Sequence, residues 1–209
     1  ARAEGIDVTL GDGSVIAGNN VALSGGDITN SGSTITAKNN LSVNSQNSIN
    51  NLNAGMLYAG ENLQLTAINN INNVSSNISG KKVSLESING DINNTTSTTL
   101  WQSNIPGDKK NITSASQTFI GPSATIASLD SLSLKSGHDI NIIGANLNAG
   151  GDLLVNAWHD IAIKGEQVTS AFDYQNSGNQ NVTNTASQIS AGHNLAIQSG
   201  HDLNVTASN

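Results

Sequence analysis

The stretch "NNLSVNSQNSINN" at residues 39–51 decides the fold, because its pattern returns as "ENLQLTAINNINN" at residues 61–73. The third and fifth residues of each copy are apolar and one polar residue separates them. A second apolar element begins eight residues after the first of these two residues. Self-similarity at a fixed period is the signature of a repeat architecture. Four of the six spacings between neighbouring copies are 20 to 22 residues, and the first apolar positions are Val21, Leu41, Leu63, Val83, Leu132, Leu153 and Leu195.

All the repeated elements are short and alternate apolar with polar residues, which is typical of strands. Gly, Asn, Asp and Ser lie between them, as turns require. Three such strands in about 21 residues make one coil of a solenoid, whose apolar columns are buried only when coils stack. We therefore predict an all-β fold, a parallel β-helix of seven to eight coils. An up-and-down β-barrel is the alternative, but it does not explain a three-element unit. The second element begins at Ile28, Ile49, Ile71, Ile92, Ile140, Ile161 and Leu203, and a weaker third is visible at Ile35, Leu57, Ile78 and Leu147.

Composition restricts the function classes. The net charge is −7 and only 11% of the residues are charged, so a nucleic-acid partner is not expected. No apolar run approaches the roughly 20 residues of a transmembrane helix, and none is expected. The absence of cysteine suits a secreted protein. No signal peptide is visible at Ala1, so we expect residues 1–209 to be a single repeat domain, a fragment of a longer exoprotein.

Asparagine recurs at one position of the coil, two residues after the start of the second element. The residues are Asn30, Asn51, Asn73 and Asn94, spaced 21, 22 and 21 residues apart. A buried polar group is costly unless it is paired, and stacked amides can pair with one another. We predict an asparagine ladder of the kind that stacked sheets favour. The alternative is that these residues lie in surface turns.

Three His-Asp pairs recur in "KSGHDINI", "NAWHDIAI" and "QSGHDLNV", with His138, His159 and His201 separated by 21 and 42 residues. Copies without histidine carry Asp, Asn or Ser at the aspartate position, as a turn requires. The spacing therefore predicts a structural corner rather than a catalytic site, because no serine nucleophile or pair of carboxylates accompanies the histidines. Three stacked imidazoles are also a weak candidate site for Zn²⁺ or Ni²⁺. No other cofactor is expected.

The two long spacings, 49 and 42 residues, predict insertions at approximately residues 97–126 and 167–189. Turn residues lie in the middle of each insertion, with β-prone residues on both sides, so we expect two β-hairpins that leave the same corner of the solenoid. Four of the six aromatic residues lie here, which makes them candidates for a binding surface, or for packing between the hairpins. They are Trp101, Phe119, Phe172 and Tyr174.

Three stretches, "LYAGENLQLTAINNINNVSSNIS" at 57–79, "LNAGGDLLVNAWHDIAIKG" at 147–165 and "ISAGHNLAIQSGHDLNVTAS" at 189–208, carry a family resemblance. They resemble the haemagglutinin repeat of filamentous-haemagglutinin-like exoproteins, which include large adhesins and the contact-dependent growth inhibition exoproteins of Gram-negative bacteria. The resemblance covers nearly the whole chain after Gly13. It implies a right-handed parallel β-helix on the bacterial cell surface, exported through a partner outer-membrane transporter.

The resemblance brings no catalytic residues, so we expect no enzymatic activity in this chain. It implies a structural segment of a secreted surface filament that displays or delivers other domains to a target cell. The alternative is an adhesive module, which binds a receptor or glycan on the target cell through the hairpins or the coil surface.

Overall fold

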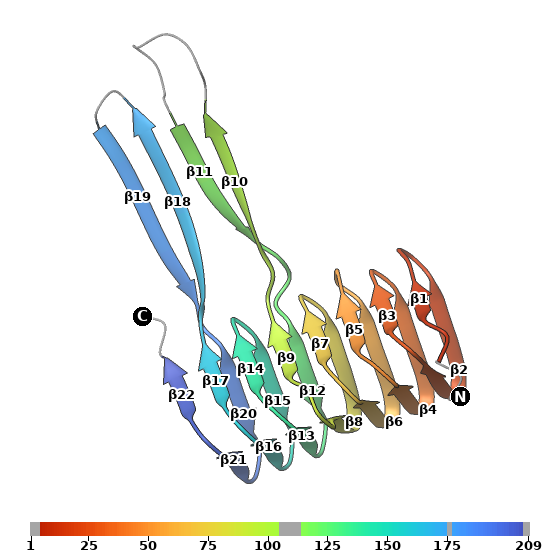
Figure 1. Ribbon diagram of the computed structural model, residues 1–209. Helices are drawn as coiled ribbons and strands as arrows, with labels where there is room; N and C mark the ends of the chain where they lie inside the picture. The colour runs from red at the N-terminus through yellow and green to blue at the C-terminus, as the bar shows by residue number, and fades with distance from the viewer. Residues whose placement is uncertain (1–4, 105–113, 175–176, 207–209) are drawn as a thin grey trace.

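The computed structural model describes residues 5–104, 114–174 and 177–206, and within them every regular element is a β-strand. Most strands stack in parallel along one axis and form a solenoid, from which two antiparallel hairpins rise on one side (Figure 1). Strands β1 and β22 lie at opposite ends of the solenoid (Figure 1). The prediction of an all-β fold with parallel stacking is confirmed. No helix in the described residues is long and apolar enough to cross a membrane.

One wall of the solenoid is an eight-stranded parallel sheet that takes one strand from each coil. Each of these strands begins at the first residue of the predicted second element, except the first strand, which precedes the recognised copies. The strands are β1 (Val8–Leu10), β3 (Ile28–Ser31), β5 (Ile49–Leu52), β7 (Ile71–Val74), β9 (Ile92–Thr95), β14 (Ile140–Ile143), β17 (Ile161–Lys164) and β22 (Leu203–Thr206).

The other walls belong to a ten-stranded sheet. In the early coils the third element of one copy and the first element of the next form a single long strand, where we expected two. These strands are β2 (Val15–Gly25), β4 (Thr34–Ser45), β6 (Met56–Ala67) and β8 (Asn77–Ser87). In the later coils a corner separates the two elements, which are β12 (Thr125–Ser128) and β13 (Leu132–Ser136), β15 (Asn146–Ala149) and β16 (Leu153–Ala157), and β20 (Gln188–Ala191) and β21 (Leu195–Ser199).

The core consists of the inward columns that the sequence pattern predicts. Leu41 lies opposite Leu63 on the adjacent coil, and both are 1% exposed. Ile126 lies between Ile78 and Leu147 in the same way, and all three are buried. Because each coil covers the apolar residues of the coil before it, burial continues along the solenoid without any single coil holding a core of its own.

The insertions form hairpins, but they are shorter than expected. The first consists of β10 (Thr98–Asn104) and β11 (Ser114–Ile120), and the second of β18 (Glu166–Tyr174) and β19 (Ser177–Thr185). The expected ends, Ile126 and Ile189, instead belong to β12 and β20. These residues return to the wall because their apolar side chains continue the columns of Ile78 and Leu147.

The two hairpins leave corresponding corners of coils that are two apart, after β9 and after β17, with β14 between them. They do not stand separately. Strand β11 pairs with β18 in antiparallel register from Ser114 opposite Asp173 to Gln117 opposite Ser170, which makes one four-stranded sheet (Figure 1). The hairpins therefore lean together away from the solenoid.

Candidate functional site

An inner column of four asparagines lies on the face of the eight-stranded sheet that is turned toward the core. Asn30, Asn51, Asn73 and Asn94 are each at most 2% exposed. The side-chain nitrogen of each residue donates to the side-chain oxygen of the next, over 2.9 Å from Asn30 to Asn51 and over 3.0 Å at the two following steps. The nitrogens also donate to nearby backbone carbonyls, for example from Asn73 to Ser76 over 2.9 Å. The buried amide nitrogens are thus all paired, which avoids the cost of an unsatisfied donor.

This inner ladder ends where the chain places an apolar residue in the column. Ile142 lies opposite Asn94, whose nitrogen donates instead to the backbone oxygen of Asn146 over 2.9 Å. At the other end Leu10 lies opposite Asn30. Among the buried side-chain nitrogen and oxygen atoms of the described residues, the Oδ1 atom of Asn30 has no hydrogen-bond partner. The ladder therefore spans four coils and leaves one acceptor unpaired.

A second, outer ladder was not recognised in the sequence. Asn72 donates to Asn50, Asn93 to Asn72, and Asn141 to Asn93, each over 2.9 Å on the half-buried outer face of the eight-stranded sheet. Here the later coil donates to the earlier one, opposite to the inner ladder. The repeated "INN" triplets at residues 49–51, 71–73 and 92–94 carried the signal, because adjacent residues of a strand face opposite sides.

The three histidines of the His-Asp pairs form a stacked column at the corner between the two walls. The ring centroids of His138 and His159 are 5.1 Å apart with planes inclined by 6°, and those of His159 and His201 are 4.8 Å apart with planes inclined by 3°. The second hairpin lies between His159 and His201 in sequence, yet the rings occupy successive coils.

The aspartates of this corner hold each coil to the one before it. An Oδ1 atom of Asp139 accepts from the backbone nitrogen of Asp160 and faces the Nδ1 atom of His159, both at 2.9 Å. Asp160 binds the nitrogen of Asp202 and the ring of His201 in the same way, at 2.9 and 2.8 Å. Each aspartate therefore has a structural role, since one carboxylate oxygen contacts both the backbone nitrogen and the histidine ring of the following coil.

These contacts shift the proton affinities at the two ends of the column. The pKa of His138 is raised, chiefly because its ring is hydrogen-bonded to Asp91 at 2.6 Å. The pKa of His201 is raised mainly by its hydrogen bond to Asp160. The pKa of Asp160 is lowered by the backbone hydrogen bond from Asp202 and then by the ring of His201. A hydrogen bond to the charged form favours that form, so these contacts favour the imidazolium form of His138 and His201 and the carboxylate form of Asp160.

The residue types of this column suit a metal ion, but the ring orientation does not. One ligand atom from each of His138, Asp139 and His159 lies within 4.8 Å of the other two, and Zn²⁺ accepts such ligands. An imidazole binds a metal in the plane of its ring, however, and one ion cannot lie in two nearly parallel planes. Each Nδ1 atom also faces a carboxylate already. Shared coordination would require at least one ring to rotate away from its aspartate.

The hairpin sheet carries the predicted aromatic residues. Trp101 and Phe119 are 50% and 52% exposed, and they lie diagonally opposite each other, since Trp101 pairs with Gln117 and Thr99 with Phe119. The backbone of Phe172 pairs with Ala115. The side chains of Phe172 and Tyr174 lie outside the described residues. Because about half of each ring is exposed, Trp101 and Phe119 are neither fully packed against the protein nor fully surrounded by solvent.

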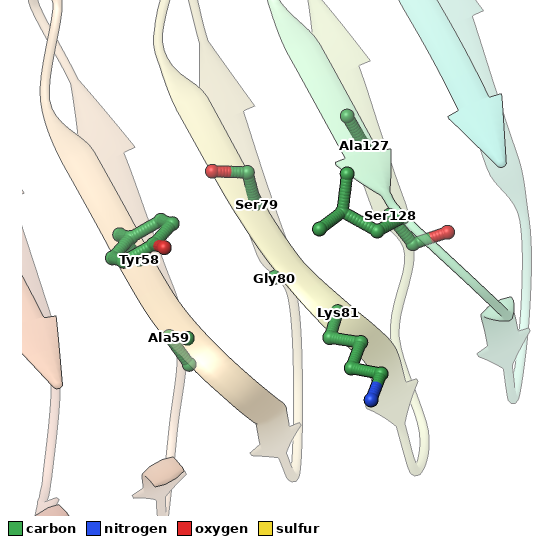
Figure 2. Close-up of a pocket in the computed structure, with 9 residues that line it drawn as sticks. Tyr58, Ala59, Ser79, Gly80, Lys81, Ala127 and Ser128 are labelled. Atoms are coloured by element: carbon green, nitrogen blue, oxygen red, sulfur yellow. The ribbon is translucent and has the colours of Figure 1, made fainter. Parts of the chain in front are cut away.

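A shallow notch lies on the outer surface of the ten-stranded sheet. Figure 2 shows Tyr58 on β6 and Ala127 on β12 on either side of β8, which contributes Ser79 and Lys81. The notch has a volume of about 280 Å³, near the lower limit for small-molecule sites. The Lys81 amine is 3.7 Å from the Glu61 carboxylate, so its charge is already paired. The notch has room for one side chain or one small ring.

The fold and the asparagine ladders together place this chain in the class of parallel β-solenoid proteins whose coils are joined by columns of identical polar residues. One family model of the haemagglutinin repeat matches this chain at residues 4–51, 39–104 and 160–209, and a second haemagglutinin repeat model matches residues 86–179. The chain belongs to the haemagglutinin repeat family of secreted, surface-displayed exoproteins. The family resemblance in the sequence is confirmed.

Several curated proteins are similar to this chain. The tRNA nuclease CdiA of Escherichia coli O6:K15:H31 (strain 536 / UPEC) is 47% identical over 228 residues, which covers 96% of this chain and 7% of the relative. The tRNA nuclease CdiA of Escherichia coli (strain STEC_O31) is 37% identical, covering 94% and 6%. The 16S rRNA endonuclease CdiA of Enterobacter cloacae subsp. cloacae is 47% identical over 142 residues, covering 68% and 4%. The chain thus spans less than a tenth of these relatives. No solved structure matches it.

Proposed function

We propose that this chain is a rigid spacer in a filament of a secreted exoprotein, and that the filament displays or delivers other domains to a target cell. The observation that carries the proposal is the register of the eight-stranded sheet, in which one strand from every coil pairs with the next in an unbroken order. Such a stack grows by adding coils without changing its cross-section. A rod of adjustable length with polar ladders inside and outside suits a spacer.

The same proposal assigns the nuclease activity named for the relatives to parts of those proteins that this chain does not match. The matched region is 7% or less of each of these relatives. The histidines of this chain hold aspartates of neighbouring coils, and their rings stack on one another, which is a structural arrangement. We propose that the chain itself is not catalytic, and that a partner outer-membrane transporter exports the protein to which it belongs.

A chimera tests the spacer role. The matching segment of the tRNA nuclease CdiA of Escherichia coli strain 536 is replaced by this chain, and surface display and inhibition of target cells are measured. A spacer should support both to within about twofold, because it contributes length and stiffness alone. A matched chimera that lacks residues 41–62, one complete coil, should also be active, since Asn40 then joins Leu63 in the register of Leu41.

Two outcomes would count against the spacer. Display without inhibition would show that this segment recognises something specific, and failure of the 41–62 deletion alone would show that length is fixed. A chimera carrying Leu65→Asp serves as the negative control, because Leu65 is fully buried in the core.

An adhesive role of the hairpin sheet is the second candidate, favoured by the half-exposed rings of Trp101 and Phe119. Exposed aromatic residues on an element held by a rigid scaffold are frequent binding determinants. Binding of the chain to target cells, compared between the parent and Trp101→Ser/Phe119→Ser, tests this role. Equal binding of the two proteins would exclude these rings as the contact surface.

A further inference from the structure

The corner that carries the histidine column also exposes a tryptophan. Trp158 lies between β16 and β17, directly before His159, and is 80% exposed. A tryptophan that contributes 150–250 Å² of apolar surface is normally among the more buried side chains of a domain. Tryptophan is also among the residues most enriched at binding hot spots, so its exposure on a rigid coil makes this corner a candidate contact surface.

The neighbouring coils leave the indole free. Backbone hydrogen bonds from Gly137 to Ser87, from Trp158 to Ser136 and from Gly200 to Ala157 show that Gly137, Trp158 and Gly200 occupy the same corner position of successive coils. A Cβ atom at Gly200 would collide with the backbone oxygen of Trp158. The corner therefore admits no side chain directly after the tryptophan, and Gly137 presents none directly before it.

Polar columns border the tryptophan on both sides. On the side of the ten-stranded sheet, Asn156 pairs with Lys135 on one coil and Gln198 on the other. On the other side stand the rings of His138, His159 and His201, with side chains 52%, 43% and 61% exposed. Since Nδ1 of each ring faces an aspartate, the Nε2 atoms remain to bind a ligand. The result is one apolar platform between two rows of hydrogen-bonding groups.

From this arrangement we infer that the Trp158 corner is a binding site for a neutral carbohydrate chain that lies along the solenoid axis. A pyranose ring has an apolar C–H face, which stacks on an indole, and hydroxyl groups at its edge, which reach the polar columns. A protein partner would instead require a continuous apolar patch around the anchor residue. Here the coils directly before and after Trp158 present glycine at this corner position, and the next exposed apolar residue of the corner, Ile88, lies two coils away. Asp91, Asp139, Asp160 and Asp202 outnumber the three histidines, and the chain carries a net charge of −7, so an acidic glycan would be repelled.

Single-tryptophan variants test this site, because the chain has only two tryptophans. In Trp101→Phe all tryptophan fluorescence comes from Trp158, and in Trp158→Phe all of it comes from Trp101. Both are titrated with cellohexaose and chitohexaose as neutral probes and with a heparin hexasaccharide as the acidic comparator. We expect the neutral probes to shift the emission of Trp101→Phe to shorter wavelength, while the heparin probe leaves it unchanged.

Affinity is then measured by calorimetry, with a glycan array that carries mammalian N-glycans and bacterial O-polysaccharides in separate arms to identify the natural source. Trp158→Ala should weaken binding at least about tenfold, the factor that corresponds to 1.4 kcal/mol. The matched control Leu129→Ala removes an apolar side chain that is also 80% exposed, at a different corner, and should bind as the parent does. Circular dichroism checks that each variant is folded.

Three results would overturn the inference. The first is a glycan array and titrations in which no neutral saccharide binds. The second is unchanged affinity in Trp158→Ala. The third is a fluorescence response that comes from Trp101 alone, which would place the saccharide on the hairpin sheet. Binding in either arm of the array that is lost in Trp158→Ala supports the site, and this result is independent of the spacer role.

Discussion

Asn51 donates its side-chain amide to the side-chain oxygen of Asn73 across 3.0 Å, and both residues are fully buried although 22 residues separate them in the chain. This bond joins two coils inside an apolar core. Each member of the column depends on the coils on both sides, so the ladder links the stability of one coil to that of its neighbours.

Asn73→Ala should destabilise the solenoid by roughly 1–3 kcal/mol, because it leaves the buried oxygen of Asn94 and a buried carbonyl without a donor. Asn62→Ala is the matched control. Asn62 donates to Asn40 over 2.9 Å in an exposed pair, where water replaces the lost bond, so the cost should be below about 0.5 kcal/mol. Urea unfolding of both variants checks the prediction, and equal losses would contradict a role for the inner ladder in stability.

Leu10→Asn should cost at least about 1 kcal/mol less than Leu65→Asn. Both changes place an amide in an apolar column. At Leu10 the new amide lies opposite Asn30 and can donate to its unpaired Oδ1 atom, whereas Leu65 has only apolar residues opposite, Val43 and Leu85. Thermal unfolding of the two variants gives the comparison. Similar melting temperatures would show that the orphan oxygen of Asn30 has another partner.

Leu65→Asp should cost on the order of 3 kcal/mol or more, because it places an unpaired charge in the core. Ser133→Asp, on the outer side of β13, should cost under about 0.5 kcal/mol, since its side chain faces away from the buried residues Leu132 and Leu134. The two variants carry the same charge, so comparable losses of stability would contradict the assignment of inner and outer faces.

Stability should pass through a maximum in mildly acidic solution because of the histidine column. The folded-state pKa of His138 and of His201 is raised above 6.5, so their contribution is complete below pH 6.5 and is lost as the pH rises through the raised values. The pKa of Asp160 is lowered from 3.8, so its contribution is present above pH 3.8 and is lost as the pH falls through the lower value.

Melting temperatures between pH 3 and pH 8 measure this profile. His138→Asn/His201→Asn should flatten the decline above pH 6.5, and His193→Asn, at the corner between β20 and β21, is the matched substitution outside the column. A profile that is identical in all three proteins would mean that the column does not couple protonation to folding.

The sequence predicts the coil register well, because inward residues such as Leu41 and Leu63 must recur at one position to be buried. It also predicts that His138, His159 and His201 share a corner, since the turn before the second element has a constant length. The bond between each ring and the aspartate of the preceding coil was not predictable, because it depends on the rotation of the side chain at an exposed turn.

The pairing of the two hairpins could not be predicted from the sequence either. Ser114 and Asp173 lie opposite each other only because the hairpins lean together, and strands rich in serine, threonine and glutamine give no apolar pattern that would fix this register. The position of Trp158 beside two glycines depends on stacking as well. A spacing in sequence shows which residues share a corner, but not which side chains remain exposed there.

Removal of both hairpins should leave the solenoid folded. In the variant, Gly-Asn replaces residues 99–119 and 167–184, so that Thr98 joins Ile120 and Glu166 joins Thr185, which are already paired across each hairpin. In the described part of the chain no residue of the hairpin strands belongs to the buried core, and the backbone bond from Gly121 to Ser97 closes the root of the first hairpin. The free energy of unfolding of the solenoid should therefore change by less than about 1 kcal/mol.

Circular dichroism and thermal unfolding of this variant check the result, with Ile126→Asn as a control that damages the core directly after the first hairpin. Aggregation or unfolding of the truncated protein at the temperature of that control would show that the hairpin sheet stabilises the solenoid. A truncated protein that folds normally and loses binding to target cells would favour the adhesive role of Trp101 and Phe119. If folding and binding are both retained, neither task depends on the hairpins, and the contact surface lies on the coils.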